Sequence, residues 1–156
     1  MDTQAIWKEM GEERRKQAAE AFYGDESLKE FHRAAELFIA RNKNFRPAFV
    51  KKLPMEKRAS YLAHLPIPPD LIGQLIVTYH FAHQKPLMSA FLNALGIENE
   101  GGVISDSADV KEPDAAALKA AAEKMKAEFP AADVRIYFAT LYAQNPETWA
   151  GLAQFS

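Results

Sequence analysis

The stretch DLIGQLIVTYHFAHQKPLMSAFLNALGI, residues 70–97, is the part of the chain that decides its fold, because it is the least polar. On a helical wheel with about 100° per residue, most apolar residues of 71–83 share one broad face, and Val77 and Phe81 lie nearly opposite. A helix that is apolar on two sides is normally covered on two sides. The segment is shorter than the roughly 20 apolar residues of a membrane span. It therefore predicts the central buried helix of an all-α bundle.

A second helix follows in the same stretch, and its end is the clearest in the sequence. Pro86 suits the first turn of a helix, because its missing N–H would have no partner there. Gly96 can adopt the left-handed conformation that ends a helix, and Ile97 can then fold back onto the last turn. The pattern predicts a helix that begins near Pro86 and ends at Gly96.

The rest of the chain is divided by prolines and glycines into further helical segments. Apolar periods predict helices over 3–22, 28–42, 54–64, 114–129, 132–144 and a short segment from 146. Gly11 weakens the first of these, and Ser27 with Glu30 has the capping-box spacing. Segment 134–142 is rich in β-forming residues but does not alternate, so helix is favoured over strand. We expect one all-α domain of about six or seven helices over 1–156.

Composition agrees with an ordinary globular domain. Of 156 residues, 48% are hydrophobic, and a domain of this length can bury a core without disulfides. The chain contains no cysteine, which excludes disulfides, thiol nucleophiles and cysteine-ligated metals. Its N-terminal residues have neither the basic nor the apolar region of a secretion signal. We therefore expect a cytoplasmic protein that does not enter a membrane.

Charge is unevenly distributed, although the net charge is only −2. Segment 41–58 has one acid, Glu56, among the basic residues Arg41, Lys43, Arg46, Lys51, Lys52, Lys57 and Arg58. Segment 98–114 has one base, Lys111, among the acids Glu98, Glu100, Asp106, Asp109, Glu112 and Asp114. Since no helical period crosses residues 97–112, we expect an acidic surface loop there.

The basic segment 41–58 is a candidate binding surface. Its basic side chains can contact phosphates while Phe45 or Phe49 stacks on a base, with the candidate residues Lys43, Arg46, Lys51, Lys52, Lys57 and Arg58. In a second interpretation the aromatics are core anchors and the charges are solvated. In a third, the segment lies against the acidic segment of the same chain or of a second copy. A pI of about 6.1 is low for a nucleic-acid-binding domain, which makes nucleic acid the less favoured ligand.

His80 and His83 form the candidate chemical site. With i, i+3 spacing their rings can project from adjoining positions and could bind a metal if other helices supplied a third ligand. No acid occurs in 71–97 and no metal-binding motif is present, so we expect no metal, with His83 a core histidine and His80 at the rim. These histidines could instead line a polar acid–base pocket, together with Tyr61, His64 and Tyr79.

The sequence favours a non-enzymatic protein–protein interaction or regulatory domain without a cofactor. It has no defensible catalytic triad and no phosphate-binding glycine pattern. An apolar helix face would supply affinity and the charged segments would supply orientation, with another protein or a second copy as partner. The alternatives are nucleic-acid or anion binding through 41–58 and a metal-dependent or acid–base enzyme that uses His80 and His83.

Overall fold

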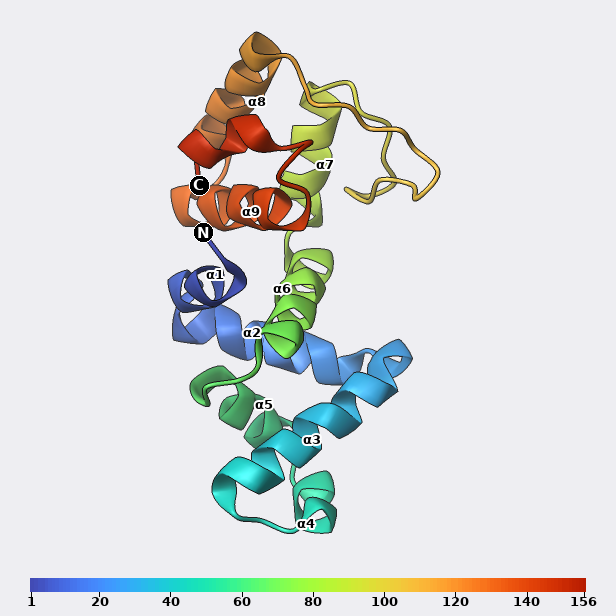
Figure 1. Cartoon of the computed structure of the whole chain (residues 1–156), viewed down its shortest axis with the longest axis vertical. Coiled ribbons are helices and arrows are strands. Elements are labelled where there is room, and N and C mark those ends of the chain that lie inside the picture. Colours follow the sequence, from blue (N-terminus) through green and yellow to red (C-terminus); the bar gives the residue numbers. More distant parts are fainter. The chain divides into compact units, whose positions relative to one another are not determined.

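The structure is a computed structural model that describes residues 1–156, and it consists of helices joined by loops (Figure 1). Its α-helices are α1 (Thr3–Glu9), α2 (Gly11–Gly24), α3 (Lys29–Lys43), α4 (Pro47–Lys52), α5 (Met55–His64), α6 (Pro69–His83), α7 (Lys85–Ala94), α8 (Ala115–Glu128) and α9 (Ala131–Gln144). Two 3₁₀ helices complete it, η1 (Glu26–Leu28) and η2 (Ala150–Gln154). The only β-type pairing is an isolated bridge between Glu100 and Val103. The predicted all-α class is confirmed, including the helical conformation of 134–142.

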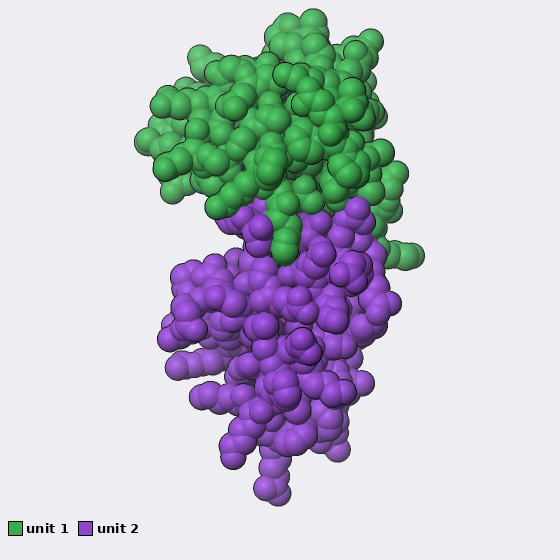
Figure 2. Space-filling model, turned by 180° about the vertical axis from the view of Figure 1, so that it is seen from behind, with its two compact units in different colours: residues 1–9, 83–156 green, residues 10–82 purple.

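The chain divides into two compact units (Figure 2). Unit 1 comprises residues 1–9 and 83–156, and unit 2 comprises residues 10–82. Helices α1, α7, α8, α9 and η2 belong to unit 1, while α2 to α5, η1 and nearly all of α6 belong to unit 2. The single domain predicted over 1–156 stays a prediction, because compactness alone does not show whether two units fold independently.

The helix predicted over 3–22 is wrong as one continuous element, because the chain breaks between α1 and α2. Gly11 at the break has a φ of 73°, a conformation that glycine adopts without the steric penalty of a Cβ. Ile6 in α1 and Phe22 in α2 are both buried, so each short helix contributes to a core. The break adjoins the boundary between the two units.

Unit 1 has an aromatic core that α7, α8, α9 and the C-terminal segment build together. Phe91 of α7 is fully buried, and its ring centroid lies 4.8 Å from that of Phe138 and 5.9 Å from that of Trp149. Leu118 of α8 and Leu152 of η2 are buried in the same cluster. The residues after α9 are therefore part of the fold of unit 1.

Helix α7 ends in the motif that the sequence predicts. Gly96 has a φ of 67°. Its N–H donates to the carbonyl oxygen of Asn93 at 3.0 Å, and the N–H of Ile97 donates to that of Leu92 at 2.9 Å. These two hydrogen bonds define a Schellman motif. After Ile97 the chain runs as a loop to Asp114, across the segment predicted to be an acidic surface loop, and Figure 1 shows it projecting from the helices of unit 1.

Helix α6 confirms the predicted helix over 71–83. Its buried residues include Leu71, Leu75 and Ile76. The second apolar face is not covered as predicted, since Phe81 is 44% exposed. None of the helices combines the length and the hydropathy that a membrane-spanning helix needs.

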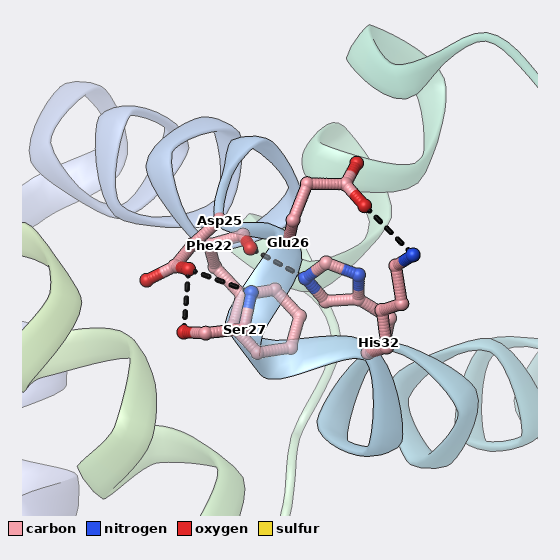
Figure 3. Close-up of polar contacts among 6 residues, drawn as sticks. Phe22, Asp25, Glu26, Ser27 and His32 are labelled. Atoms are coloured by element: carbon pink, nitrogen blue, oxygen red, sulfur yellow. Dashed lines mark hydrogen bonds and ion pairs between the residues drawn. The ribbon is translucent and has the colours of Figure 1, made fainter.

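The turn between α2 and α3 in unit 2 is held by polar contacts (Figure 3). Asp25 Oδ1 accepts hydrogen bonds from the backbone N–H of Ser27 at 3.0 Å and from its hydroxyl at 2.6 Å. The predicted capping box of Ser27 and Glu30 is wrong, because the Asp25 carboxylate already caps η1. On α3, His32 Nε2 hydrogen-bonds to the carbonyl oxygen of Phe22, and this bond joins the end of α2 to α3.

The stability of this turn should depend on pH through Asp25. The hydrogen bonds from Ser27 hold the pKa of the Asp25 carboxyl below its ordinary value. A depressed pKa in the folded state stabilises the fold above the ordinary value of about 3.9, and this contribution is lost as the pH falls through the folded-state pKa. Asp25→Ala should therefore lower the melting temperature at neutral pH, and the difference from wild type should shrink in acid. Thermal melts across this pH range measure it.

The control for this experiment is Glu123→Ala, since Glu123 is an exposed acid in the middle of α8 and forms no ion pair within the chain. Its melting temperature should stay near that of the wild type at every pH. A difference between Asp25→Ala and wild type that does not change from neutral to acidic pH would contradict the assignment of the effect to the Asp25 carboxylate.

Candidate protein-interaction surface

The basic segment 41–58 forms the end of α3, all of α4 and the start of α5, within unit 2. Helix α3 ends at Asn44, whose φ of 56° is left-handed, and the N–H of Phe45 donates to the carbonyl oxygen of Ala40 at 2.8 Å. Asparagine tolerates this conformation better than most residues with a side chain. Pro47 then opens α4, where it needs no N–H donor. The chain thus reverses tightly and presents α4 beside α3.

The aromatic residues of this segment have different roles. Val50 is the residue that anchors α4, since it is fully buried, whereas its neighbour Phe49 is 50% exposed. The ring centroid of Phe45 lies 5.1 Å from that of Phe49 and 6.1 Å from that of Tyr61 on α5. Lys43 Nζ lies 5.4 Å from the centre of the Tyr61 ring. Phe45 therefore joins α4 to α5, and Phe49 leaves an apolar surface open to solvent.

Arg58 is held inside the fold of unit 2. Its Nη1 donates to Glu36 Oε1 on α3 at 3.0 Å, and the two side chains are only 19% and 14% exposed. Its guanidinium also lies over the ring of Tyr23 on α2, 4.8 Å from the ring centroid. Burial raises the pKa of Tyr23 well above its ordinary range, so its hydroxyl stays neutral. Arg58 thus connects α2, α3 and α5, and we assign it to the scaffold of the surface.

The other basic residues of the segment are displayed to solvent. The exposed ones are Arg41, Lys43, Arg46, Lys51, Lys52 and Lys57. None of these six forms an ion pair with a carboxylate of the chain. Arg33 on α3 is a further exposed cation without such a pair. Because cations that form no ion pair with a carboxylate attract anions, these side chains favour an anionic ligand.

An open groove of about 280 Å³ lies beside α3 and α4. It is lined by Arg33, Glu36, Leu37, Pro47, Ala48 and Lys51. Leu37 is 52% exposed, the largest exposed fraction among the large apolar side chains. The groove therefore combines apolar lining from both helices with two basic side chains and with Glu36, whose carboxylate is paired with Arg58. We name the surface formed by Arg33, Leu37, Pro47, Ala48, Phe49, Lys51 and Lys52 the α3–α4 surface.

Arg33 and Leu37 are not among the predicted binding residues, because both precede the basic segment in sequence. A local signal existed for Leu37, which is apolar but lies off the buried stripe of α3 that contains Ala35 and Ile39. Only the fold shows that Pro47 of α4 lines the same groove as Leu37.

The residues of the predicted polar pocket have separate partners. His64 Nε2 lies 3.1 Å from Glu12 Oε1, and its Nδ1 lies 2.7 Å from the carbonyl oxygen of Ser60. Tyr61 contacts Phe45 and Lys43, as described above. Tyr79 and His80 are neighbours in sequence, and their ring centroids lie 5.6 Å apart. His64 and Tyr61 are thus engaged with residues outside the predicted pocket, and the pocket stays a prediction.

The predicted roles of the two histidines are reversed. His80 is 3% exposed and its Nδ1 lies 2.8 Å from the carbonyl oxygen of Ile76, whereas His83 is exposed. A helical wheel assumes that the same face is buried along the whole helix. Near the end of α6 the buried residues instead include Thr78 and His80. No group of three or more histidine and carboxylate side chains is placed to bind a metal ion.

A cavity of about 620 Å³ lies at the acidic loop. Its lining residues are Lys85, Glu98, Asn99, Glu100, Val103, Ser105 and Ala108. Asn99 Nδ2 donates to the carbonyl oxygen of Ile97 at 3.0 Å, and Asn99 Oδ1 accepts from the N–H of Gly102 at 3.0 Å. These bonds give the first part of the loop a defined conformation.

Comparisons with protein-family models, with curated proteins and with solved structures find no match to this chain. Its function is therefore argued from its own surfaces.

Proposed function

We propose that this chain is a non-enzymatic interaction protein whose α3–α4 surface binds an acidic protein segment that carries an exposed apolar residue. The observation that supports the proposal is the groove in which exposed Leu37 lines the same cavity as Arg33 and Lys51. An apolar side chain exposed among cations without acidic partners suits a ligand that is both apolar and anionic.

The lining of the groove favours a protein segment over nucleic acid. Leu37, Pro47 and Ala48 offer aliphatic surface, which fits an apolar side chain but provides no ring on which a base can stack. Phe49 is the one aromatic ring of this surface that is strongly exposed. Nucleic-acid binding through Phe49 and the lysines is therefore the competing outcome of the test.

We expect the interaction to be modest in affinity and sensitive to salt. The groove is small, and interfaces that bury little surface are weak and transient, with dissociation constants of roughly 1–100 μM. The cations of the surface are exposed, so salt screens their attraction for an acidic ligand. In 1 M salt the Debye length is only about 3 Å. The apolar contribution of Leu37 should persist at high salt.

The proposal is tested with peptides selected on the full chain from a randomised display library. The selected peptides should combine several acids with one apolar residue. Their affinity, measured by fluorescence anisotropy, should fall at least about tenfold in Lys51→Glu/Lys52→Glu, because reversal of two charges replaces attraction by repulsion. Leu37→Asp should weaken the same peptides, because it places a carboxylate in the groove.

The matched control is Lys119→Glu/Lys124→Glu, which reverses two exposed charges of α8 in unit 1. It should leave peptide affinity unchanged. Single-stranded oligo(dT) serves as the nucleic-acid probe. If oligo(dT) binds in a way that depends on Lys51 and Lys52, and no such peptide is selected, nucleic acid replaces the acidic protein segment as the ligand. If neither oligo(dT) nor a selected peptide binds, the proposed function is refuted.

A further inference from the structure

We infer that the ligand of the α3–α4 surface is the acidic loop, residues 97–114, of a second copy of this chain. This inference rests on the proposed function, because it uses the same surface and names its partner. It makes the chain a homodimer whose two copies exchange loop and surface contacts.

The first argument is charge complementarity. The loop carries the exposed acids Glu98, Glu100, Asp106, Asp109 and Glu112, and none of them forms an ion pair within the chain. Asp114 is engaged as the N-cap of α8, where its carboxylate accepts hydrogen bonds from Ala116 and Ala117. Acids without cationic partners are thus concentrated in this loop of unit 1, and cations without acidic partners are concentrated on the α3–α4 surface of unit 2. Contact between such a loop and such a surface would lower the repulsion within each.

The second argument is an apolar residue on the same loop. Val103 is 43% exposed, although it is β-branched and apolar. The N–H of Glu100 donates to the carbonyl oxygen of Val103 at 2.9 Å, and the N–H of Val103 donates to that of Glu100 at 3.1 Å. This tight turn presents Val103 among acids, which is the combination that the groove with Leu37 and Lys51 suits.

The third argument is that the loop has a defined conformation before it binds. Gly102 is buried and packs against Met88 of α7, and Asn99 holds the turn by its hydrogen bonds. A segment that is already ordered loses less conformational entropy on binding than a flexible one. Figure 1 shows the loop extending beyond the helices of unit 1, where a second molecule can reach it.

In a dimer with two-fold symmetry, the acidic loop of each copy would contact the α3–α4 surface of the other. Each copy has one loop and one α3–α4 surface, so a two-fold axis forms the same contact twice and closes the assembly as a dimer. The second contact forms within the same complex, which raises the overall affinity above that of a single contact.

The experiment measures the mass of the full chain by sedimentation velocity across a concentration series. Wild type should dimerise at about 50 mM salt, and its dissociation constant should rise at least about tenfold at about 500 mM salt. A loop variant, Asp106→Lys/Asp109→Lys, and a surface variant, Lys51→Glu/Lys52→Glu, should each be monomeric. An equimolar mixture of the two should dimerise again, because each loop then faces a surface of opposite charge.

Val103→Asp tests the apolar contact and should also weaken the dimer, whereas Lys119→Glu/Lys124→Glu should dimerise like wild type. A monomeric wild type, including one whose loop binds its own surface, would overturn the inference. So would a dimer that persists in both reversal variants, or a mixture that stays monomeric. If a monomeric wild type still binds the selected peptides through Lys51, the proposed function stands and only the second copy is excluded as the ligand. If it does not bind them, the proposed function and the homodimer inference both fail.

Discussion

Replacement of Arg58 by alanine is expected to lower the free energy of unfolding by about 2–4 kcal/mol, the largest loss for any basic residue of segment 41–58. The guanidinium forms an ion pair with Glu36 and stacks on Tyr23, and both acidic and basic side chains are mostly buried. Alanine would leave the Glu36 carboxylate without its partner in a poorly solvated place. It would also remove the contact that connects α2, α3 and α5.

Urea denaturation followed by circular dichroism measures this change. Lys57→Ala is the matched control, because Lys57 precedes Arg58 on α5 but is exposed, and it should change the free energy of unfolding by less than about 0.5 kcal/mol. A double-mutant cycle with Glu36→Ala should give a coupling energy of at least about 1 kcal/mol. Equal effects of Arg58→Ala and Lys57→Ala would show that Arg58 is a surface cation after all.

Gly102→Ala is expected to destabilise unit 1 by about 2–4 kcal/mol, because it combines backbone strain with a steric overlap. Gly102 has a φ of 87°, and an added Cβ would overlap the Cβ of Met88 and lie 3.2 Å from the backbone nitrogen of Ser89. The backbone of a helix cannot move aside as a flexible side chain can. The acidic loop would have to separate from α7 to admit the methyl group.

Gly101→Ala provides the control on the adjacent residue. Gly101 also has a positive φ, 59°, but an added Cβ there meets no atom within 4 Å, so only the cost of the left-handed conformation remains, about 1 kcal/mol. Thermal unfolding gives both values, and hydrogen exchange should show faster exchange of loop amides in Gly102→Ala. Similar effects of the two substitutions would mean that the contact with Met88 does not anchor the loop.

The sequence by itself determined the class of fold and several helix ends. Pro47, Pro86 and Gly96 act through their own backbone restrictions, so the elements that they begin or end could be located without knowledge of distant residues. The opposite charges of segments 41–58 and 98–114 were likewise visible, because charge depends only on residue type. These local properties led to the segments on which the proposed function rests.

Only the tertiary structure decided which residues of those segments are exposed and available to bind a ligand. Arg58 and Lys51 carry the same charge. Arg58 is held inside unit 2 by its contacts with Glu36 and Tyr23, whereas Lys51 lines a groove. His80 and His83 likewise exchanged their expected burial. The physical reason is that the burial and pairing of a side chain depend on contacts between segments that are far apart in sequence. A helical period indicates that a face is buried, but it does not specify which segment covers that face.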